Sequence, residues 1–257
     1  MALNVPARHN EKLQALVAAI DADVELAQWW KCANINAVDR QGMTDHGEVH
    51  IRIVANAALK LLRLLIEAGI QVSVEANYGM TAEDAEVIVV AAAALHDVGI
   101  AVHRVNHEQL SIPMAVSILP RLLADIYVPA ERVIIQAEIL HAIVAHHWDV
   151  KCLTIESGVV KVADALDMTQ GRSRIPYEMG ETSIHTISAA AIDQVRLIAG
   201  TDKPICIEIE MSNSAGVFQV DELLKRKLRN SSIAPYVQVV ANIKGETEKR
   251  LLEFYTL

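Results

Sequence analysis

The chain has 257 residues, of which 52% are hydrophobic but only 4% aromatic, and its formal net charge is -9. This length allows one large domain, or one domain with a small companion, and the apolar content is sufficient for a sizeable core. The acidic balance disfavours non-specific binding to nucleic acid or to an anionic membrane.

Cysteine usage and hydropathy indicate a cytoplasmic location. Cys32, Cys152 and Cys206 have no CxxC or CxxH spacing, which suggests free thiols in a reducing compartment. The chain begins with a polar stretch rather than a signal peptide, and no uncharged run approaches the roughly 20 residues that span a bilayer. We therefore expect a soluble, cytoplasmic protein.

Helical patterns dominate the chain as far as residue 188. Apolar residues at a 3.6-residue period predict a helix over 48–69. A capping box that begins at Thr81 opens an apolar helix over 82–97. An irregular segment is expected over 33–49 and a loop over 70–82. Further helices are predicted over residues 8–31, 109–125, 130–147 and 156–169.

The pattern changes near residue 190. Residues 194–198 and 204–211 alternate apolar and polar side chains as strands do, and residues 236–243 and 250–257 again read as strands. A charged helix is predicted between the two pairs, over 221–230. The fold class is therefore mainly α, with a helical bundle over 1–188 followed by a small α+β unit of ββαββ order over 189–257.

The run VIVVAAAALHD at 87–97 is the most informative stretch. It is a buried helix that ends abruptly in His96 and Asp97, so it presents an imidazole and a carboxylate at the edge of the core. His50 lies in the first turn of another helix, and Asp164 lies in an apolar run where a carboxylate is costly to bury unless it is paired or metal-bound. Imidazole and carboxylate are ligands for Mn, Fe, Co, Ni, Zn or Mg, and no cysteines are placed for a structural zinc site.

At these positions the sequence resembles the HD superfamily of metal-dependent phosphohydrolases. The resemblance is carried by His50 followed by Ile-Arg-Ile-Val-Ala, by His96-Asp97 followed by Val-Gly, and by Asp164 at the end of Lys-Val-Ala-Asp. The chain as a whole looks like archaeal and bacterial proteins usually called HD-superfamily hydrolases, whose substrates are poorly defined. The resemblance implies an HD-domain helical bundle with His50, His96, Asp97 and Asp164 around one divalent metal ion.

Members of the superfamily with two metal ions add histidines after the HD pair, and Asp97 would then bridge the ions. His107 and the pair His146-His147 are similar to these extra ligands. A histidine at a helix end also complements the helix dipole, so the choice between one and two ions stays open. Ile100 stands where the HD-GYP phosphodiesterases have Lys, and no GYP follows the histidine pair, which disfavours a cyclic dinucleotide substrate.

Arginines are the candidates for binding substrate phosphate. Arg172 and Arg174 lie in a GRSRIP stretch that resembles the basic pair of the diadenosine-tetraphosphate hydrolases, and their guanidinium groups suit phosphate oxygens. The alternative is that Arg172 and Arg174 are surface residues of a solvated loop and do not bind substrate. Arg104 is a further candidate for substrate binding. His46, His103 and His141 are expected to support the site or the fold rather than bind metal.

These residues predict hydrolysis of a phosphate ester, from a nucleotide or another small phosphorylated metabolite, by metal-activated water. Asp97 would orient the water, and Arg172 or Arg174 would stabilise charge on the phosphoryl oxygens. The alternatives are a di-iron oxygenase that uses the same ligands, an HD-fold nucleotide-binding sensor or scaffold without turnover, and histidines that only satisfy core hydrogen bonds. The C-terminal sheet would cover the site or form a homodimer through an edge strand.

Overall fold

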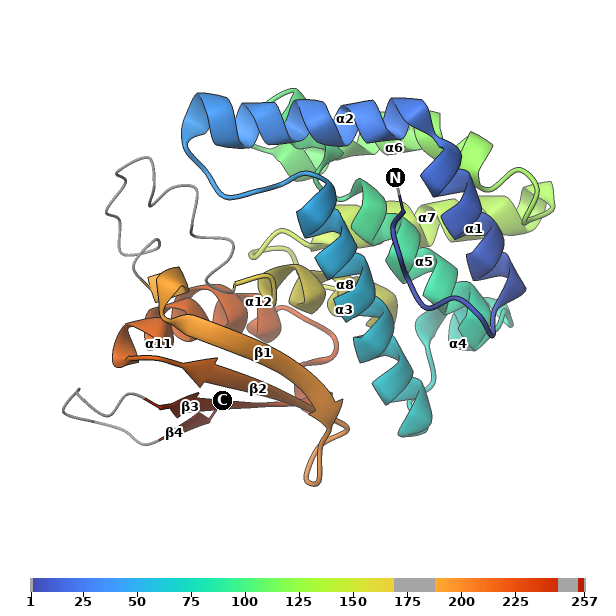
Figure 1. Cartoon of the computed structure of the whole chain (residues 1–257). Coiled ribbons are helices and arrows are strands. Elements are labelled where there is room, and N and C mark those ends of the chain that lie inside the picture. Colours follow the sequence, from blue (N-terminus) through green and yellow to red (C-terminus); the bar gives the residue numbers. More distant parts are fainter. Residues whose placement is uncertain (1, 169–187, 245–253, 257) are drawn as a thin grey trace.

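The structure is a computed structural model that describes residues 2–168, 188–244 and 254–256. A bundle of helices packs beside a small sheet with its own helical layer (Figure 1), which confirms the mainly α fold class. No helix in these ranges is long and apolar enough to cross a bilayer. The bundle is formed by α1 (Glu11–Ala22), α2 (Val24–Asn34), η1 (Ile35–Asp39), α3 (Glu48–Glu67), α4 (Ser73–Tyr78), α5 (Ala82–Leu95), η2 (Val98–Ala101), α6 (His107–Leu122), α7 (Pro129–Ala145) and α8 (Ile155–Ala165).

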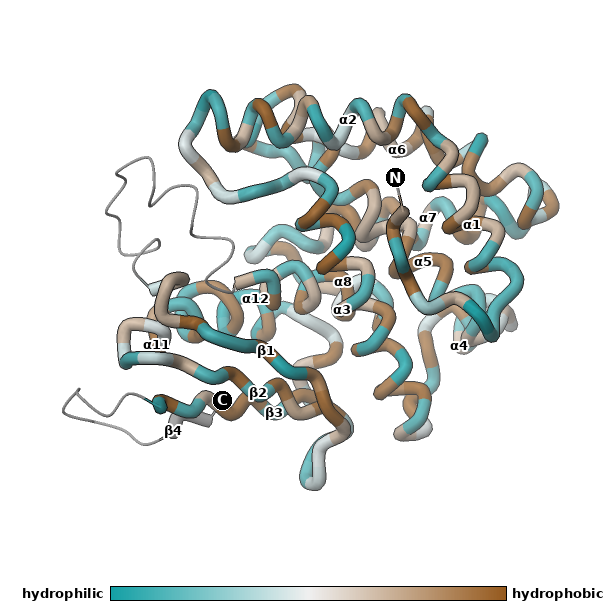
Figure 2. The backbone as a smooth tube through the Cα atoms, viewed as in Figure 1, coloured by the Kyte–Doolittle hydropathy of each residue, from teal (hydrophilic) through white to brown (hydrophobic). Residues whose placement is uncertain are grey.

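Helix α5 lies at the centre of the bundle, and its residues are buried from Asp84 to Leu95. Helices α1, α3, α7 and α8 pack around it. A helix that is apolar on all sides is stable only when it is covered on all sides, and the run of alanines allows close approach of its neighbours. Along α3, by contrast, hydrophobic and hydrophilic residues alternate because only one face meets the core (Figure 2).

Three local expectations were wrong. The helix predicted over 8–31 is two helices, because Asp23 adopts an extended backbone (ψ 96°) and caps α2 by accepting a hydrogen bond from Leu26 N at 2.9 Å. The segment 33–49 is not irregular throughout, since α2 continues into the π-helical turn η1. The loop predicted over 70–82 contains α4, which ends at Gly79 with a φ of 66°.

The C-terminal unit has the predicted ββαββ order. Its sheet contains β1 (Ile192–Ala199), β2 (Ile205–Met211), β3 (Val237–Ile243) and β4 (Phe254–Thr256), in spatial order β1-β2-β3-β4. Strands β2 and β3 are parallel, and a parallel pair requires a crossover connection. That crossover is helical, through η3 (Ser214–Gly216), α11 (Val217–Gln219), η4 (Val220–Lys225), α12 (Arg226–Arg229) and η5 (Ala234–Tyr236).

The C-terminal unit docks directly on α8. Ser232 Oγ donates a hydrogen bond to the backbone carbonyl of Thr154 at 2.6 Å, and Ser231 Oγ donates to the carbonyl of Gly158 at 3.1 Å. A Cβ at Gly158 would overlap Ser232 Oγ and lie 2.8 Å from Ser231 Oγ. The close approach of the two parts therefore depends on a glycine in a helix. The division of the chain at residue 188 stays a prediction.

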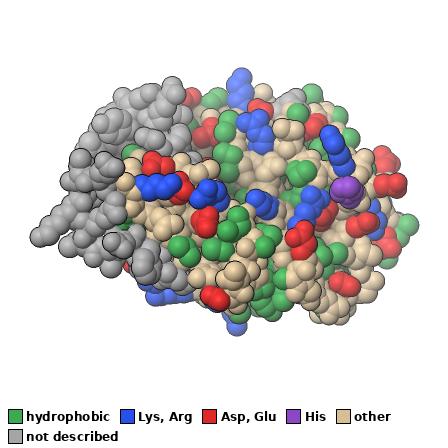
Figure 3. Space-filling view, turned by 60° about the horizontal axis from the view of Figure 1, so that its bottom comes forward, with side chains coloured by type: hydrophobic (Ala, Val, Ile, Leu, Met, Phe, Trp, Pro, Cys, Tyr) green, Lys and Arg blue, Asp and Glu red, His purple; other side chains and the backbone are tan. Residues whose placement is uncertain are grey.

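Charged groups are mixed on the molecular surface. On the face shown in Figure 3, acidic and basic side chains are interspersed, with hydrophobic side chains between them. This distribution agrees with the mixed, moderately acidic composition of the chain.

Gly158→Ala tests the docking. Alanine in a helix interior is normally favoured over glycine by about 1 kcal/mol, but here we expect a loss of about 1–3 kcal/mol because the new methyl group overlaps Ser232. Denaturant unfolding measures the change. Adding Ser232→Ala removes the nearest obstacle and should recover part of the loss, relative to Ser232→Ala alone. A stabilised Gly158→Ala variant would show that the docking is loose.

Candidate metal centre

The end of α5 delivers two adjacent side chains to one place. His96 is the last residue with helical backbone, and Asp97 (φ -105°, ψ 2°) begins the turn into η2. Both side chains are buried. Ser111 of α6 fixes this turn, because its Oγ accepts a hydrogen bond from Gly99 N at 2.9 Å and donates to the carbonyl of His96 at 2.8 Å.

A first group of side chains converges on this turn from α3 and α8. His50 Nε2 lies 3.3 Å from both His96 Nε2 and Asp164 Oδ1, and 3.5 Å from Asp97 Oδ2. His96 Nε2 lies 3.4 Å from Asp97 Oδ2 and 3.7 Å from Asp164 Oδ1. The four residues singled out in the sequence are therefore neighbours in space.

A second group shares the Asp97 carboxylate. His107, the first residue of α6, places Nε2 3.0 Å from Asp97 Oδ1. His146, which follows α7, places Nε2 3.2 Å from His107 Nε2 and 3.8 Å from Asp97 Oδ1. Asp97 thus directs one carboxylate oxygen to each group, and either group can hold a metal ion.

Outer contacts fix the orientation of the imidazole rings. His50 Nδ1 lies 2.6 Å from Asp167 Oδ2, and the Nδ1 atoms of His96 and His146 lie 2.8 Å and 2.5 Å from the carbonyls of Ala93 and Ile143. Each Nδ1–H donates to its acceptor, so the Nε2 lone pairs face the centre, as metal binding requires.

Three polar atoms lie close enough to His107 Nδ1 to be its hydrogen-bond or ion-pair partner. Its Nδ1 lies 3.0 Å from the carbonyl of Arg104 and 3.2 Å from Glu108 Oε2, and also 2.7 Å from Arg104 Nη1. Donation to the carbonyl or carboxylate leaves Nε2 free as a ligand. Within each group two Nε2 atoms then face each other, those of His50 and His96 in the first and those of His107 and His146 in the second. A cation bound by both nitrogens of a pair would stabilise this arrangement.

The surroundings of the centre set the protonation states of its two carboxylates and of His146. Burial alone would raise the pKa of Asp97, but its contacts with His96 and His107 hold that pKa well below its usual value. Burial likewise opposes ionisation of Asp164, and the Lys227 ammonium holds its pKa well below normal. Burial lowers the pKa of His146 well below its usual value. The carboxylates are therefore ionised and His146 is neutral near pH 7.

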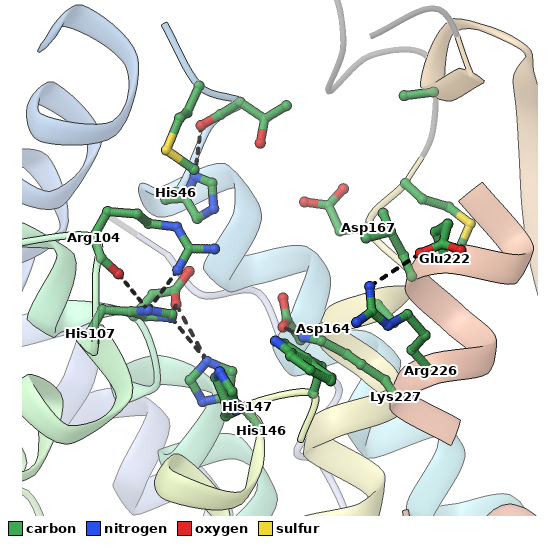
Figure 4. A pocket seen from close by; sticks show the side chains of 18 of the residues that line it. His46, Arg104, His107, His146, His147, Asp164, Asp167, Glu222, Arg226 and Lys227 are labelled. Carbon is green, nitrogen blue, oxygen red and sulfur yellow. Dashed lines mark hydrogen bonds and ion pairs between the residues drawn. The ribbon is translucent and has the colours of Figure 1, made fainter. Parts of the chain in front are cut away.

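A cavity of about 560 Å³ opens onto the second group (Figure 4). The residues that line it belong to the segment before α3, to the turn at His96 and Asp97, to the ends of α7 and α8, and to the helical segment of the C-terminal unit. Among the lining residues are Gln41, Met43, Thr44, His46, Asp97, Arg104, His107, Glu108, His146, His147, Trp148, Asp164, Asp167, Met168, Gln219, Glu222, Leu223, Arg226 and Lys227.

The remaining predicted site residues have different positions. His147 lines the cavity but belongs to neither group, since its Nδ1 accepts a hydrogen bond from Asp149 N at 3.3 Å. Arg104 lines the cavity beside His107. Arg172 and Arg174 lie outside the residues that the structure describes.

The histidines His46, His103 and His141 lie outside the two groups. The ring of His46 is 5.4 Å from that of His50. His103 Nδ1 accepts a hydrogen bond from Val105 N at 3.0 Å, and His141 Nε2 accepts one from Leu153 N at 3.1 Å.

Sequence reasoning missed two contributors to the site. The contact of Asp167 with His50 has no sequence signal, because Asp167 lies beyond the end of α8, where helical spacing no longer applies. Lys227 lies in the helix that the sequence predicts to be charged, over 221–230. Its pairing with Asp164 joins residues 63 positions apart, and no local pattern signals such a contact.

The comparisons with known proteins agree with this geometry. The HD domain model matches residues 47–169, a span that contains both groups of the centre, and the chain belongs to the HD-domain family. It is 43% identical to the uncharacterized protein MJ1020 of Methanocaldococcus jannaschii over 227 residues, which is 88% of this chain and 87% of that protein. No solved structure matches the chain. Family membership suggests metal-dependent phosphohydrolase activity.

Gly99→Ala tests the packing that holds His107 in place. A Cβ at Gly99 would overlap the backbone carbonyl of His107 and lie 2.6 Å from Ser111 N. We expect α6 to shift, with a loss of about 1–3 kcal/mol of stability and a lengthened distance between His107 Nε2 and Asp97 Oδ1. Unfolding and a crystal structure of the variant measure both. Adding Ser111→Ala should not rescue it, since the obstacle is backbone; full rescue would contradict this explanation.

Proposed function

We propose that this protein is a metal-dependent phosphohydrolase that holds two divalent cations and hydrolyses a phosphate ester of a nucleotide or another small phosphorylated metabolite. The observation that carries the proposal is the Asp97 carboxylate, with one oxygen directed at each of two histidine groups. In this arrangement Asp97 would contribute one carboxylate oxygen to each of two cations.

The donor set fits divalent cations. His50, His96, Asp97 and Asp164 would hold one ion, and Asp97, His107 and His146 the other. These groups are nitrogen and oxygen donors without thiolate, which suits Mn, Fe, Co, Ni, Zn or Mg. His147, with its Nδ1 turned to Asp149 N, is left out of the proposed ligand set.

The bound ions and the protein side chains would have different roles in hydrolysis. Bound cations supply Lewis acidity and lower the pKa of a bound water. The buried carboxylates and the outward Nδ1 contacts keep the ligands in fixed positions, so little reorganisation is needed during reaction. Arg104 borders the second group and is proposed to bind phosphate, as are Arg172 and Arg174.

Among phosphate esters, the size and lining of the cavity favour a nucleotide as the substrate. Its volume of about 560 Å³ lies in the range of small-molecule sites. Trp148 and His147 line it with their ring centroids 5.4 Å apart, and Trp148 is 43% exposed. An exposed aromatic surface near a phosphate site suits stacking of a base.

Asp97→Asn tests the bridging carboxylate. We expect the wild-type chain to bind about two equivalents of Mn²⁺ and to hydrolyse a generic phosphodiester or phosphomonoester. The variant should lose at least one equivalent and at least about 100-fold in turnover. Elemental analysis and a chromogenic assay measure the two effects. Asp125→Asn, at an exposed position outside the cavity, is the matched control.

Retention of full metal content and turnover in Asp97→Asn would refute the assignment. Oxygen-dependent turnover by an iron-loaded chain would instead indicate a di-iron oxygenase. Nucleotide binding without turnover by the metal-loaded wild-type chain would indicate a sensor or scaffold.

Asp167→Asn tests the support of His50. The carboxylate lies 2.6 Å from His50 Nδ1, and loss of such a partner typically weakens metal binding 10–100-fold. We expect the first Mn²⁺ dissociation constant to rise by about that factor, as measured by calorimetric titration. Asp39→Asn, at an exposed position, should bind Mn²⁺ as the wild-type chain does. An unchanged constant in Asp167→Asn would show that His50 is oriented without this carboxylate.

A further inference from the structure

One basic side chain from the C-terminal unit reaches the candidate metal centre. Lys227 of α12 forms an ion pair with Asp164 Oδ2, and the two side chains are 17% and 13% exposed. The other oxygen of the same carboxylate, Oδ1, lies 3.3 Å from His50 Nε2. Figure 4 shows Lys227 extending from the C-terminal helix toward Asp164 at the wall of the cavity. A single carboxylate therefore links the histidine cluster to the C-terminal unit.

The cavity needs cations to admit a phosphate group. Among its described lining residues, five are acidic: Asp97, Glu108, Asp164, Asp167 and Glu222. The cations in the same set are Arg104, Arg226 and Lys227.

These three cations have different partners. Arg226 pairs with Glu222 at 3.1 Å and lies 4.3 Å above the ring of Trp148, while Arg104 contacts His107. Lys227 differs from both, because its partner is a carboxylate of the centre itself. Its ammonium is therefore the one placed closest to the first group of proposed ligands.

The partner of Lys227 should depend on metal loading. Without a cation, the ammonium compensates the buried charge of Asp164, which would otherwise be costly. A divalent cation held by Asp164 would take over that role and would repel the ammonium, because like charges a few ångströms apart in a poorly solvated site repel strongly. The flexible lysine stem allows the ammonium to move to an anion in the cavity.

We propose that Lys227 is a substrate-phosphate ligand supplied by the C-terminal unit. It pairs with Asp164 in the metal-free protein and donates hydrogen bonds to a phosphoryl oxygen when the centre holds its cations. This role rests on the proposed function and adds to it a specific anion-binding group from outside the HD domain. A lysine that only orients Asp164 is the competing explanation.

Two titrations on the full chain separate these roles. The first measures the affinity for Mn²⁺ alone, and the second measures the affinity of the Mn²⁺-loaded protein for inorganic phosphate. Lys227→Met should weaken phosphate binding about 10-fold or more, the scale of a lost charge-assisted hydrogen bond. Its Mn²⁺ affinity without phosphate should be unchanged or higher, because a competing cation is removed. With a hydrolysed ester, KM should rise.

The controls use the same helical segment. Lys225→Met removes an equal charge from a lysine that pairs with Asp221 at 2.8 Å, and it should bind phosphate as the wild-type chain does. Lys227→Arg keeps the charge and should retain phosphate binding within a few-fold. If Lys227→Met does not fold, Lys227→Gln, which keeps a polar end near Asp164, replaces it in both titrations.

The outcomes are distinguishable. Unchanged phosphate affinity in Lys227→Met, whether or not Mn²⁺ binding is weakened, overturns this role, and weakened Mn²⁺ binding would assign Lys227 to the orientation of Asp164. A wild-type chain that binds none of Mn²⁺, Fe²⁺, Co²⁺, Ni²⁺, Zn²⁺ and Mg²⁺ overturns the proposed function together with this role.

Discussion

The buried carboxylate of Asp97 is the constraint on which the centre depends. An ionised carboxylate at this depth is costly unless surrounding groups compensate its charge. The fold surrounds it with the imidazoles of His50, His96, His107 and His146, which come from four separate elements and are each held by a contact at the outer nitrogen. The covered helix α5 brings Asp97 to the core edge, so the apolar packing of the bundle and the polar chemistry of the centre are parts of one arrangement.

The C-terminal unit belongs to the same arrangement. Its helical segment packs on α8, the helix that carries Asp164, and it forms one wall of the cavity. The sequence predicts that the C-terminal sheet covers the site or forms a homodimer through an edge strand. The structure places the helical segment, rather than the strands, against the cavity.

The sequence predicted the fold class and the cluster because both have local signals. His50, His96 and Asp164 each lie in a short pattern tied to one helix, and strand alternation marked the C-terminal unit. What could not be predicted depends on distant contacts or on single backbone angles. The break at Asp23 needs one extended residue inside a helical pattern, and the Lys227 ion pair needs the tertiary docking of two units. The residues that carry no local signal are the ones that connect the parts.

The ion pair between Lys227 and Asp164 also has a consequence for biosynthesis. The match to the HD domain model ends at residue 169, so every residue of the histidine cluster is synthesised before the helical segment that lines the cavity. During synthesis Asp164 therefore precedes its ammonium partner Lys227 by 63 residues. A chain that stops before α12 (Arg226–Arg229) would lack that partner for the Asp164 carboxylate.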